Sequence, residues 1–373
     1  MNLDFSDEQK QLRDQVRRFL EEKCPPAAVR AVLEGEQHYD ADLYKGLAEL
    51  GVLGAAISEE FGGIGLGHLE LCVVAEEIGR VLAPVPVASS IYLVAEGLVQ
   101  AGSDEQKSQW LPKLADGTAI GCFAVSEGSG RMNPDKVTLT ADAGKLTGSK
   151  APVADGMIAD VAIVLARDAG GVSLYLVDLS AEGVTREALE SIDPTRSQAR
   201  LTFDAAPASR IGGEGDGWHI ATQVMDRAAI LIGFEQLGGS DRALEMARDY
   251  ALERMAFGRQ IGSFQAIKHM LSDMYVSATL ARSNCYYGAW ALSSSAAELP
   301  IAAATARVSA TTAFQHCSKN NIQVHGGMGF TWAFDCHLYY RRSNALALAL
   351  GSLSTWESLL IERMSTGNVE AAA

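Results

Sequence analysis

The spacing of apolar residues predicts a helical first part of the chain. After Ser6, apolar residues recur at helical intervals at Leu12, Val16 and Phe19, and serine is a residue type that caps helix N-termini. Later stretches show the same spacing, with a glycine-rich break at 59–67 (EEFGGIGLG). The further helices predicted here are Asp40–Leu50, His68–Arg80, Ser89–Ala101 and Asp104–Ala115.

The pattern changes near residue 118 and again near residue 217. Between these points, short runs of branched apolar residues alternate with turn residues, which is typical of a compact β barrel or sandwich. The predicted strands are Ile120–Val125, Val137–Thr140, Lys145–Gly148, Val161–Leu165, Val172–Val177 and Arg200–Phe203. Long helical patterns then return, over Ala221–Arg254, Phe264–Ser295, Ile301–Gln323 and Ala333–Met364. We therefore expect an α+β protein with a helical domain (1–117), a β domain (118–217) and a C-terminal helical bundle (218–373).

The charge of the chain argues against one class of partner. Its 46 acidic and 31 basic residues give a net charge of −15, whereas nucleic-acid binding needs a basic surface. No apolar run reaches the roughly 20 residues that span a bilayer, and the charged N-terminus does not resemble a signal peptide, so we expect a cytoplasmic protein. The six cysteines are scattered without a CxxC pair, which favours reduced core thiols over disulfides or a metal site.

Two breaks in the C-terminal helical region are suited to binding a cofactor. Residues 250–269 (YALERMAFGRQIGSFQAIKH) place Arg254, Phe257 and Arg259 around a turn, with Ser263 as the expected N-cap of the next helix. A helix N-terminus beside arginines suits a phosphate, and an aromatic ring suits a planar group. The same residues are also compatible with a structural helix–turn–helix that merely exposes its arginines.

The second break is QVHGGMGFTW, residues 323–332. A cluster of glycines marks a tight turn or a close approach of the backbone to a ligand. Together the two breaks indicate a large cofactor with phosphates and a flat ring. No GxGxxG follows a predicted strand, so a Rossmann nicotinamide site is not expected.

These segments resemble signatures of the acyl-CoA dehydrogenase family of flavoenzymes. The resemblance is carried by DYALERMAFGRQIGSFQAIKH (249–269) and NNIQVHGGMGFTWAFDCHLYYRR (320–342), and extends to residues 50–67 and 102–117. It covers essentially the whole chain in the right order, and the family has the same helical–β–helical plan. It implies FAD as cofactor, an acyl-CoA substrate, and a homotetramer or an α2β2 heterotetramer.

The resemblance also implies which residues hold FAD. Three match a segment that embraces the diphosphate and adenine across a subunit interface, four match a glycine segment from a neighbouring subunit, and two lie in the β region. They are Arg254, Phe257 and Gln265; Gln323, Val324, Gly326 and Gly327; and Phe123 and Ser126. His325, beside the glycines, is expected to pack or form hydrogen bonds rather than to catalyse.

In the family, a carboxylate removes the α proton of the acyl-CoA while a hydride leaves the β carbon for the flavin, and the electrons pass to an electron-transferring flavoprotein. The two family positions for this base match Leu350 and Ala228, which carry no carboxylate. Glu235 lies two turns after Ala228 on nearly the same helix face, in apolar surroundings that penalise its charged form. It is either a relocated base or a structural residue bonded to a neighbouring helix. Asp226 and Glu357 are further carboxylates, expected on solvated or interface faces.

The β region departs from the family at the isoalloxazine half of the site. Residues 123–133 (FAVSEGSGRMN) keep Ser126, Glu127 and Gly130, but the run after Lys150 lacks the usual aromatic residue and threonine. This pattern resembles a bacterial branch of α2β2 enzymes that act on steroid or other bulky acyl-CoAs, in which one subunit supplies the base. Two hypotheses follow: a self-sufficient dehydrogenase with a relocated base, or a non-catalytic FAD-binding partner subunit.

Overall fold

The chain divides into two compact units. The computed structural model describes residues 5–128 and 130–371, with side chains described as far as residue 366. One unit, here called the sheet unit, comprises Arg30–Leu71 and Pro84–Ala228. The other, called the bundle unit, comprises Met1–Val29, Cys72–Ala83 and Ala229–Ala373. The helices α2, α4 and α7 contribute residues to both units.

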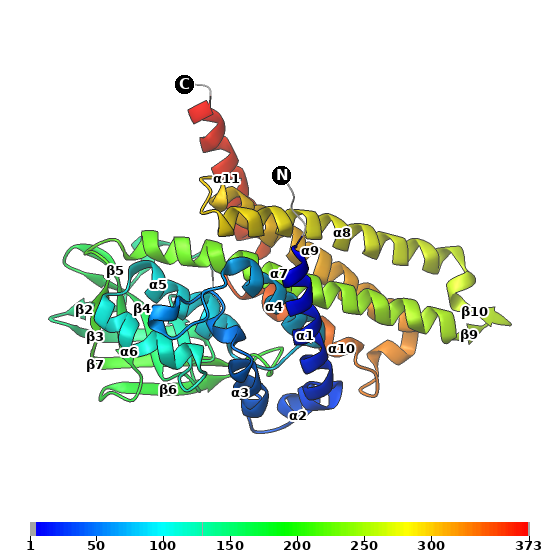
Figure 1. The fold of residues 1–373 in the computed structure, drawn as a ribbon, viewed down its shortest axis with the longest axis horizontal. Coiled ribbons are helices and arrows are strands. Elements are labelled where there is room, and N and C mark those ends of the chain that lie inside the picture. The colour runs from blue at the N-terminus through cyan, green and yellow to red at the C-terminus, as the bar shows by residue number, and fades with distance from the viewer. Residues whose placement is uncertain (1–4, 129, 372–373) are drawn as a thin grey trace. The chain divides into compact units, whose positions relative to one another are not determined.

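An eight-stranded sheet forms much of the sheet unit (Figure 1). The strands follow the order β6-β7-β3-β2-β4-β5-β8, and β1 pairs with β4. The pairs β1–β4 and β2–β4 are parallel and the others are antiparallel. The strands are β1 (Gly121–Ala124), β2 (Thr140–Asp142), β3 (Lys145–Ala154), β4 (Val161–Asp168), β5 (Gly171–Asp178), β6 (Val184–Leu189), β7 (Gln198–Pro207) and β8 (Ser209–Ile211).

A π-helical stretch, Ala88–Ala95, packs on β1 in this unit. Ser90 Oγ accepts a hydrogen bond from the Gly121 amide at 3.1 Å. A Cβ at Gly121 would lie 2.7 Å from Val94, so only glycine allows this approach. The neighbouring helices are α2 (Pro26–Glu34), α3 (Ala41–Glu49), α5 (Glu96–Ala101) and α6 (Asp104–Ala115), with 3₁₀ turns at Val52–Gly54, Glu59–Phe61 and Pro134–Lys136.

Long helices form the bundle unit. In Figure 1, α7 and α8 run side by side, and glycines and alanines bring them and α9 close together. Gly233 of α7, for example, faces Cys285 of α8 and Ala310 of α9. The helices are α1 (Asp7–Lys23), α4 (His68–Val81), α7 (Gly217–Glu253), α8 (Gln265–Ser293), α9 (Leu299–His325), α10 (Cys336–Leu348) and α11 (Leu353–Ala371).

Helices α4 and α7 lie in close backbone contact in the bundle unit. A Cβ at Gly79 would lie 1.9 Å from the Glu235 carbonyl oxygen, and one at Gly238 would lie 1.9 Å from the Glu76 carbonyl oxygen. Both obstacles are backbone atoms of a regular helix, which cannot move aside without displacing the helix itself. The two glycines therefore set the distance between the helix axes.

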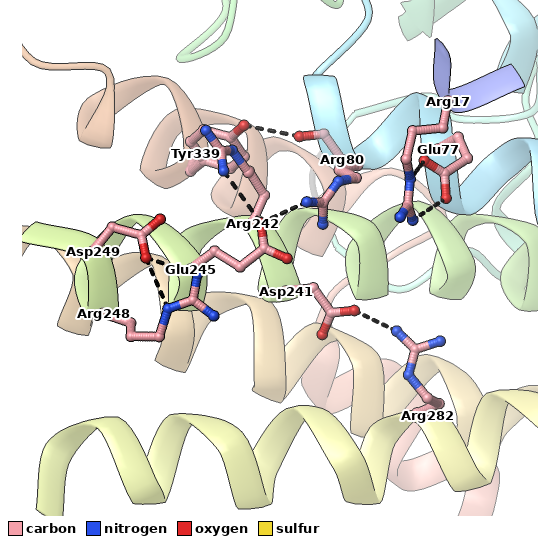
Figure 2. Close-up of polar contacts among 10 residues, drawn as sticks. All are labelled: Arg17, Glu77, Arg80, Asp241, Arg242, Glu245, Arg248, Asp249, Arg282 and Tyr339. Carbon is pink, nitrogen blue, oxygen red and sulfur yellow. Dashed lines mark hydrogen bonds and ion pairs between the residues drawn. The ribbon is translucent and has the colours of Figure 1, made fainter. Parts of the chain in front are cut away.

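Ion pairs also connect α4 and α7 with neighbouring helices, and Figure 2 shows several of them. Arg17 of α1 binds Glu77 of α4 with two hydrogen bonds of 2.7 and 2.8 Å. Arg80, also of α4, binds Glu245 of α7, and the backbone carbonyl of Arg80 accepts a hydrogen bond from Tyr339 of α10. Burial of the Glu77 carboxyl raises its pKa in spite of Arg17. The pairs orient α1, α4, α7 and α10 about one crossing.

Further ion pairs connect α8 to the same helices. Arg282 lies 2.5 Å from Asp241 of α7 and 2.9 Å from Glu76 of α4. Burial lowers the affinity of its guanidinium for a proton, but the two carboxylates outweigh that effect and raise its pKa. One guanidinium thus connects three helices of the bundle unit.

A buried arginine and a tryptophan hold the junction between α10 and α11. Arg307 of α9 is 1% exposed and donates to Gln236 of α7 and to the Leu346 carbonyl in the last turn of α10. Burial lowers the pKa of Arg307 to about 10, and a cation is favoured at a helix C-terminus. Trp356 Nε1 donates to the Leu350 carbonyl at 3.0 Å. The backbone on both sides of the junction is therefore fixed by side chains from α9 and α11.

The order helical, β, helical is confirmed, and so is the cap at Ser6, whose side chain forms a capping box with Gln9. The single helix predicted over 333–364 is wrong: it is two helices, α10 and α11, separated at Ala349–Ser352, where Gly351 has φ +100°. The strands β6 and β8 are not among those predicted. The domain boundaries near 118 and 217 stay predictions. No helix within residues 5–128 and 130–371 is long and apolar enough to cross a membrane.

The glycine contact between α4 and α7 predicts a large penalty for one added methyl group. We expect Gly238→Ala to reduce the free energy of unfolding by about 3 kcal/mol, since a clash with backbone cannot relax by a rotamer change. Gly233→Ala on the same helix is the control, because its nearest obstacle is the Cys285 side chain at 3.2 Å. Urea denaturation of both variants measures the difference. Equal losses would contradict the packing argument.

Candidate functional site

The first predicted cofactor segment is a small hairpin at the end of α7. Helix α7 ends at Glu253, and β9 (Met255–Ala256) pairs with β10 (Arg259–Gln260). Phe257 and Gly258, at its tip, have φ of +52° and +78°. Two successive residues with positive φ match the turn type that best joins twisted strands, although the conformation is costly for Phe257. Phe257 is 95% exposed. The strained turn presents an aromatic ring to the surroundings.

Ser263 does not cap the following helix, contrary to the sequence-based prediction. It ends a 3₁₀ turn (Ile261–Ser263), and its hydroxyl donates to the Gln260 carbonyl at 2.7 Å. Helix α8 begins at Gln265, with Phe264 at the N-cap position and no side-chain cap. The extra 3₁₀ turn displaces the start of the helix from the position that the serine indicates. The first amides of α8 are consequently left without a side-chain acceptor.

The second predicted segment follows directly on α9. His325 ends this helix, Gly326 adopts φ +60°, and a 3₁₀ turn runs over Gly326–Phe330. A Cβ at Gly326 or Gly327 would meet no atom within 4 Å, so this backbone faces open space. Gln323 is exposed, whereas Val324 is buried. The glycine backbone can therefore be approached from outside.

His325 packs against α7 and forms a hydrogen bond within α9. Its ring stacks on Tyr250 of α7 at 4.1 Å between centroids, and Nδ1 lies 2.8 Å from the Asn321 carbonyl. A carbonyl only accepts, so Nδ1 carries the hydrogen. Burial lowers the pKa of His325. The neutral imidazole joins the ends of α7 and α9, and both predicted cofactor segments lie just beyond these ends.

The side chains of the bundle unit fit a diphosphate with an attached ring system. Arg254 is exposed and makes no ion pair with any residue that the structure describes. Gln265 is exposed at the uncapped start of α8. Free amides, a guanidinium and an exposed ring are what a dinucleotide requires. These residues can hold the diphosphate and adenine half of FAD.

In the sheet unit, the residues predicted to contact the flavin lie on β1 and the loop after it. Phe123 is buried in β1. Ser126 Oγ donates to the Gly128 carbonyl, and its own carbonyl accepts from the Ala151 amide. Ser126 and Glu127 belong to the lining of a pocket of about 90 Å³ together with Trp218. The Ser126 hydroxyl is therefore already engaged as a donor within its own loop, and only its oxygen could still accept a hydrogen bond from a ligand.

An ion pair fixes the same loop to β3. Lys150 is fully buried, and its Nζ lies 2.6 Å from Glu127 Oε1. Burial raises the pKa of the Glu127 carboxyl, but hydrogen bonds from Lys150, Thr138 and Leu139 outweigh it and bring the pKa to about 2. Burial in turn lowers the pKa of Lys150. The contact is not evident from the sequence, because the two residues are separated by 23 positions along the chain.

The two family positions for the base are apolar and buried. Leu350 is 6% exposed and Ala228 is 0% exposed. Glu235 is also fully buried, at the point where the α7 backbone meets Gly79 of α4. Asp226 is buried, whereas Glu357 is exposed on α11. The position of Glu235 in the contact between α4 and α7 favours a structural role for this residue over a role as the catalytic base.

Comparison with known proteins identifies the chain. The model described as "Acyl-CoA dehydrogenase, N-terminal domain" matches residues 6–118, and "Acyl-CoA dehydrogenase, C-terminal domain" matches residues 215–364. The chain belongs to the acyl-CoA dehydrogenase family and is an oxidoreductase of the kind that acts on CH–CH groups.

Individual relatives cover nearly the whole chain. Acyl-CoA dehydrogenase IpdE2 of Mycobacterium tuberculosis is 34% identical over 93% of this chain and 94% of its own length. A structure of a variant of the steroid ACAD named Tcur3481-Tcur3483 is 30% identical with a TM-score of 0.90, over 97% of this chain and 99% of that one. An acyl-CoA dehydrogenase of Bacillus anthracis, described as complexed with FAD, is 25% identical with a TM-score of 0.91, over 99% of this chain and 68% of that one.

The Glu127–Lys150 pair predicts a loss of stability in acid. The pKa of Glu127 lies at about 2, below its ordinary 4.5, so the contribution to stability is complete above about pH 4.5 and is lost as the pH falls towards 2. Glu127→Gln leaves Lys150 buried beside a neutral group and should cost about 3 kcal/mol at pH 7. Glu187→Gln, which breaks the exposed pair with Arg200, should cost less than about 0.5 kcal/mol. Denaturant unfolding between pH 3 and pH 7 tests both expectations.

Proposed function

We propose that this chain is the FAD-binding, base-lacking subunit of a heteromeric acyl-CoA dehydrogenase that acts on a bulky acyl-CoA. One observation carries the proposal: Leu350 and Ala228, at both family positions for the base, are apolar and buried. A side chain without a titratable group cannot remove the α proton, so a carboxylate must come from another chain. The paired name of the steroid ACAD relative is compatible with an enzyme built from two different chains.

The alternative is a self-sufficient enzyme in which Glu235 is the base. Its position on α7, seven residues after Ala228, is what favours this alternative. Against it stands the complete burial of the Glu235 side chain within the chain itself. A base must come within about 3 Å of the proton that it removes.

This chain's own residues would hold the cofactor rather than transfer the proton. FAD, when bound, supplies the acceptor for the hydride that leaves the β carbon. Arg254 and the α8 amides would bind the diphosphate, and Phe257 would lie against the adenine. Gly326 and Gly327 would let the backbone of a neighbouring subunit approach the same cofactor. The electrons would then pass to an electron-transferring flavoprotein.

An apolar strip on α8 supports assembly with another chain. Tyr275, Val276 and Leu280 are 62%, 53% and 62% exposed, and they follow one another within six residues of a helix. Large apolar side chains gathered in this way mark interaction surfaces. The occupant would be a second copy in a homotetramer or the base-bearing chain in an α2β2 assembly.

Loss of Arg254 should weaken cofactor binding without unfolding the chain. We expect Arg254→Met to raise the dissociation constant for FAD by about tenfold to a hundredfold, the effect of one charge-assisted hydrogen bond. Arg248→Met is the control, since Arg248 is an exposed arginine on α7 that pairs with Asp249. Flavin retained on purification and equilibrium dialysis give the result. Equal retention by both variants would remove Arg254 from the site.

The missing base predicts the behaviour of the flavin in anaerobic titrations with acyl-CoAs. The purified chain alone should keep its yellow colour with every thioester, and bleaching should appear only when a base-bearing paralogue is added. Leu350→Glu should restore slow bleaching to the chain alone, because it places a carboxylate at the family position, whereas Leu350→Gln should not. Bleaching of the wild-type chain alone that disappears in Glu235→Gln would establish the alternative.

A further inference from the structure

Most of the lining of the pocket at Ser126 comes from one loop. Ten of the twelve lining residues lie between Val125 and Val137, and the other two are Leu165 of β4 and Trp218 of α7. This stretch, 125–137, is here called the pocket loop. It runs from the end of β1 towards β2 and belongs to neither strand. Its shape therefore depends mainly on contacts outside the pairing of those strands.

The Glu127 carboxylate closes the pocket loop at its base. Its Oε2 accepts hydrogen bonds from the amide and the hydroxyl of Thr138, at 2.8 and 2.6 Å, and its Oε1 accepts from the Leu139 amide at 3.0 Å. Lys150 of β3 completes the set, with Nζ 2.6 Å from Oε1 and 3.5 Å from the Val125 carbonyl oxygen. The two ends of the loop are thus joined to each other and to one lysine.

Stability alone does not account for this ion pair. The Lys150 side chain is 0% exposed, and burying two charges costs about as much free energy as their attraction returns. An apolar pair of similar volume is often as stable or more stable. Apolar side chains, however, offer no acceptor to the amides of Thr138 and Leu139. The distinct contribution of the pair is therefore a single conformation of the pocket loop.

Trp218 is held in the same pocket by backbone packing. A Cβ at Gly217 would lie 2.4 Å from the Ser173 carbonyl carbon, so α7 begins directly against β5. The Gly215 amide also donates to Ser173 Oγ at 3.0 Å. Trp218 is half-buried, and its Nε1 makes no hydrogen bond with any residue that the structure describes. A fixed indole with a free N–H is thereby available to a ligand.

An isoalloxazine ring fits the groups that this pocket offers. The ring has an N–H donor and carbonyl acceptors, while the Ser126 oxygen can accept a hydrogen bond and Trp218 Nε1 can donate one. The indole also presents an aromatic face to a planar ligand. Residues 151–154, directly after Lys150, include no aromatic side chain, and Trp218 is the aromatic residue among the lining residues described.

We propose that Lys150 is a positioning residue for flavin binding: through Glu127 it holds the pocket loop in the one conformation that meets the isoalloxazine ring beside Trp218. The inference rests on the proposed function and assigns the ring half of the cofactor to this loop. Lys150 is itself too buried to touch the cofactor, and Glu127 binds its ammonium group. A loop that is ordered before the ligand arrives loses little conformational entropy on binding. Loss of the pair should weaken contacts to the ring and leave the contacts to the diphosphate, which the bundle unit would supply, unchanged.

The test compares FAD with ADP on the assembled protein after removal of bound flavin. ADP carries the adenosine and the diphosphate of FAD without the ring. Equilibrium dialysis gives both dissociation constants, and visible circular dichroism reports the surroundings of the bound ring. The wild-type protein should bind FAD about a hundredfold more tightly than ADP, because only FAD carries the group that the pocket binds.

Two variants separate positioning from stability. Glu127→Leu with Lys150→Met removes the pair without leaving a buried charge unpaired, so its urea midpoint should stay within about 0.5 M of the wild-type value. Its dissociation constant for FAD should nevertheless rise about tenfold or more, that for ADP should change less than about twofold, and the circular dichroism of the bound flavin should change. Lys150→Met alone should affect the two ligands in the same way, since Glu127 keeps its hydrogen bonds from Thr138 and Leu139.

The matched control is Glu187→Leu with Arg200→Met, which removes an exposed ion pair of the same sheet and should leave both constants and the spectrum unchanged. An unchanged constant for FAD in the variants of the buried pair, equal weakening of FAD and ADP, or equal binding of both ligands by the wild-type protein would each overturn this inference alone. Loss of the folded state in both variants would show that the pair serves stability, which also overturns it. If the wild-type assembly binds neither ligand, the proposed function falls and takes this inference with it.

Discussion

The contact between α4 and α7 is the constraint on which the bundle unit depends. Two glycines bring the helix backbones together, and ion pairs shown in Figure 2 connect α4 and α7 with neighbouring helices. Arg17, Arg80 and Arg282 each bind a carboxylate that burial alone would disfavour as an ion. The charges are stable only where backbone packing holds their partners in place, so the ion pairs and the close helix contact depend on each other.

The same helix α7 links this packing to the candidate site. Its C-terminal end is joined to α9 by the stacking of Tyr250 on His325, and the cofactor hairpin and the glycine turn both start from these ends. Helix α7 ends at Glu253 and α9 ends at His325. The exposed ring of Phe257 and the open space at Gly326 lie just after these two helix ends. A rigid support with strained or glycine-rich ends is what a large planar cofactor requires.

Sequence patterns predicted the long helices well, but they did not predict short polar strands or breaks within a helical region. The capping box at Ser6 and the long helices follow from periodicity and from side chains close in sequence. Half of the residues of strand β6, VTREAL, are polar and none is buried, so the strand carries little apolar signal. The break between α10 and α11 has helix-forming residues on both sides, and only Gly351 marks it. The ion pair of Glu127 and Lys150 could not be predicted, since its members come together only through the fold.

The junction that carries Leu350 has an evolutionary consequence. Arg307 holds the carbonyl of Leu346 and Trp356 holds the carbonyl of Leu350, so the backbone there is secured by side chains on other helices. The hydrogen bonds that hold this backbone do not involve the side chain at position 350. A lineage could therefore exchange the residue at this position, losing one chemical capability, without first having to rebuild the scaffold. Gene duplication followed by division of labour between paralogues needs this kind of structural independence.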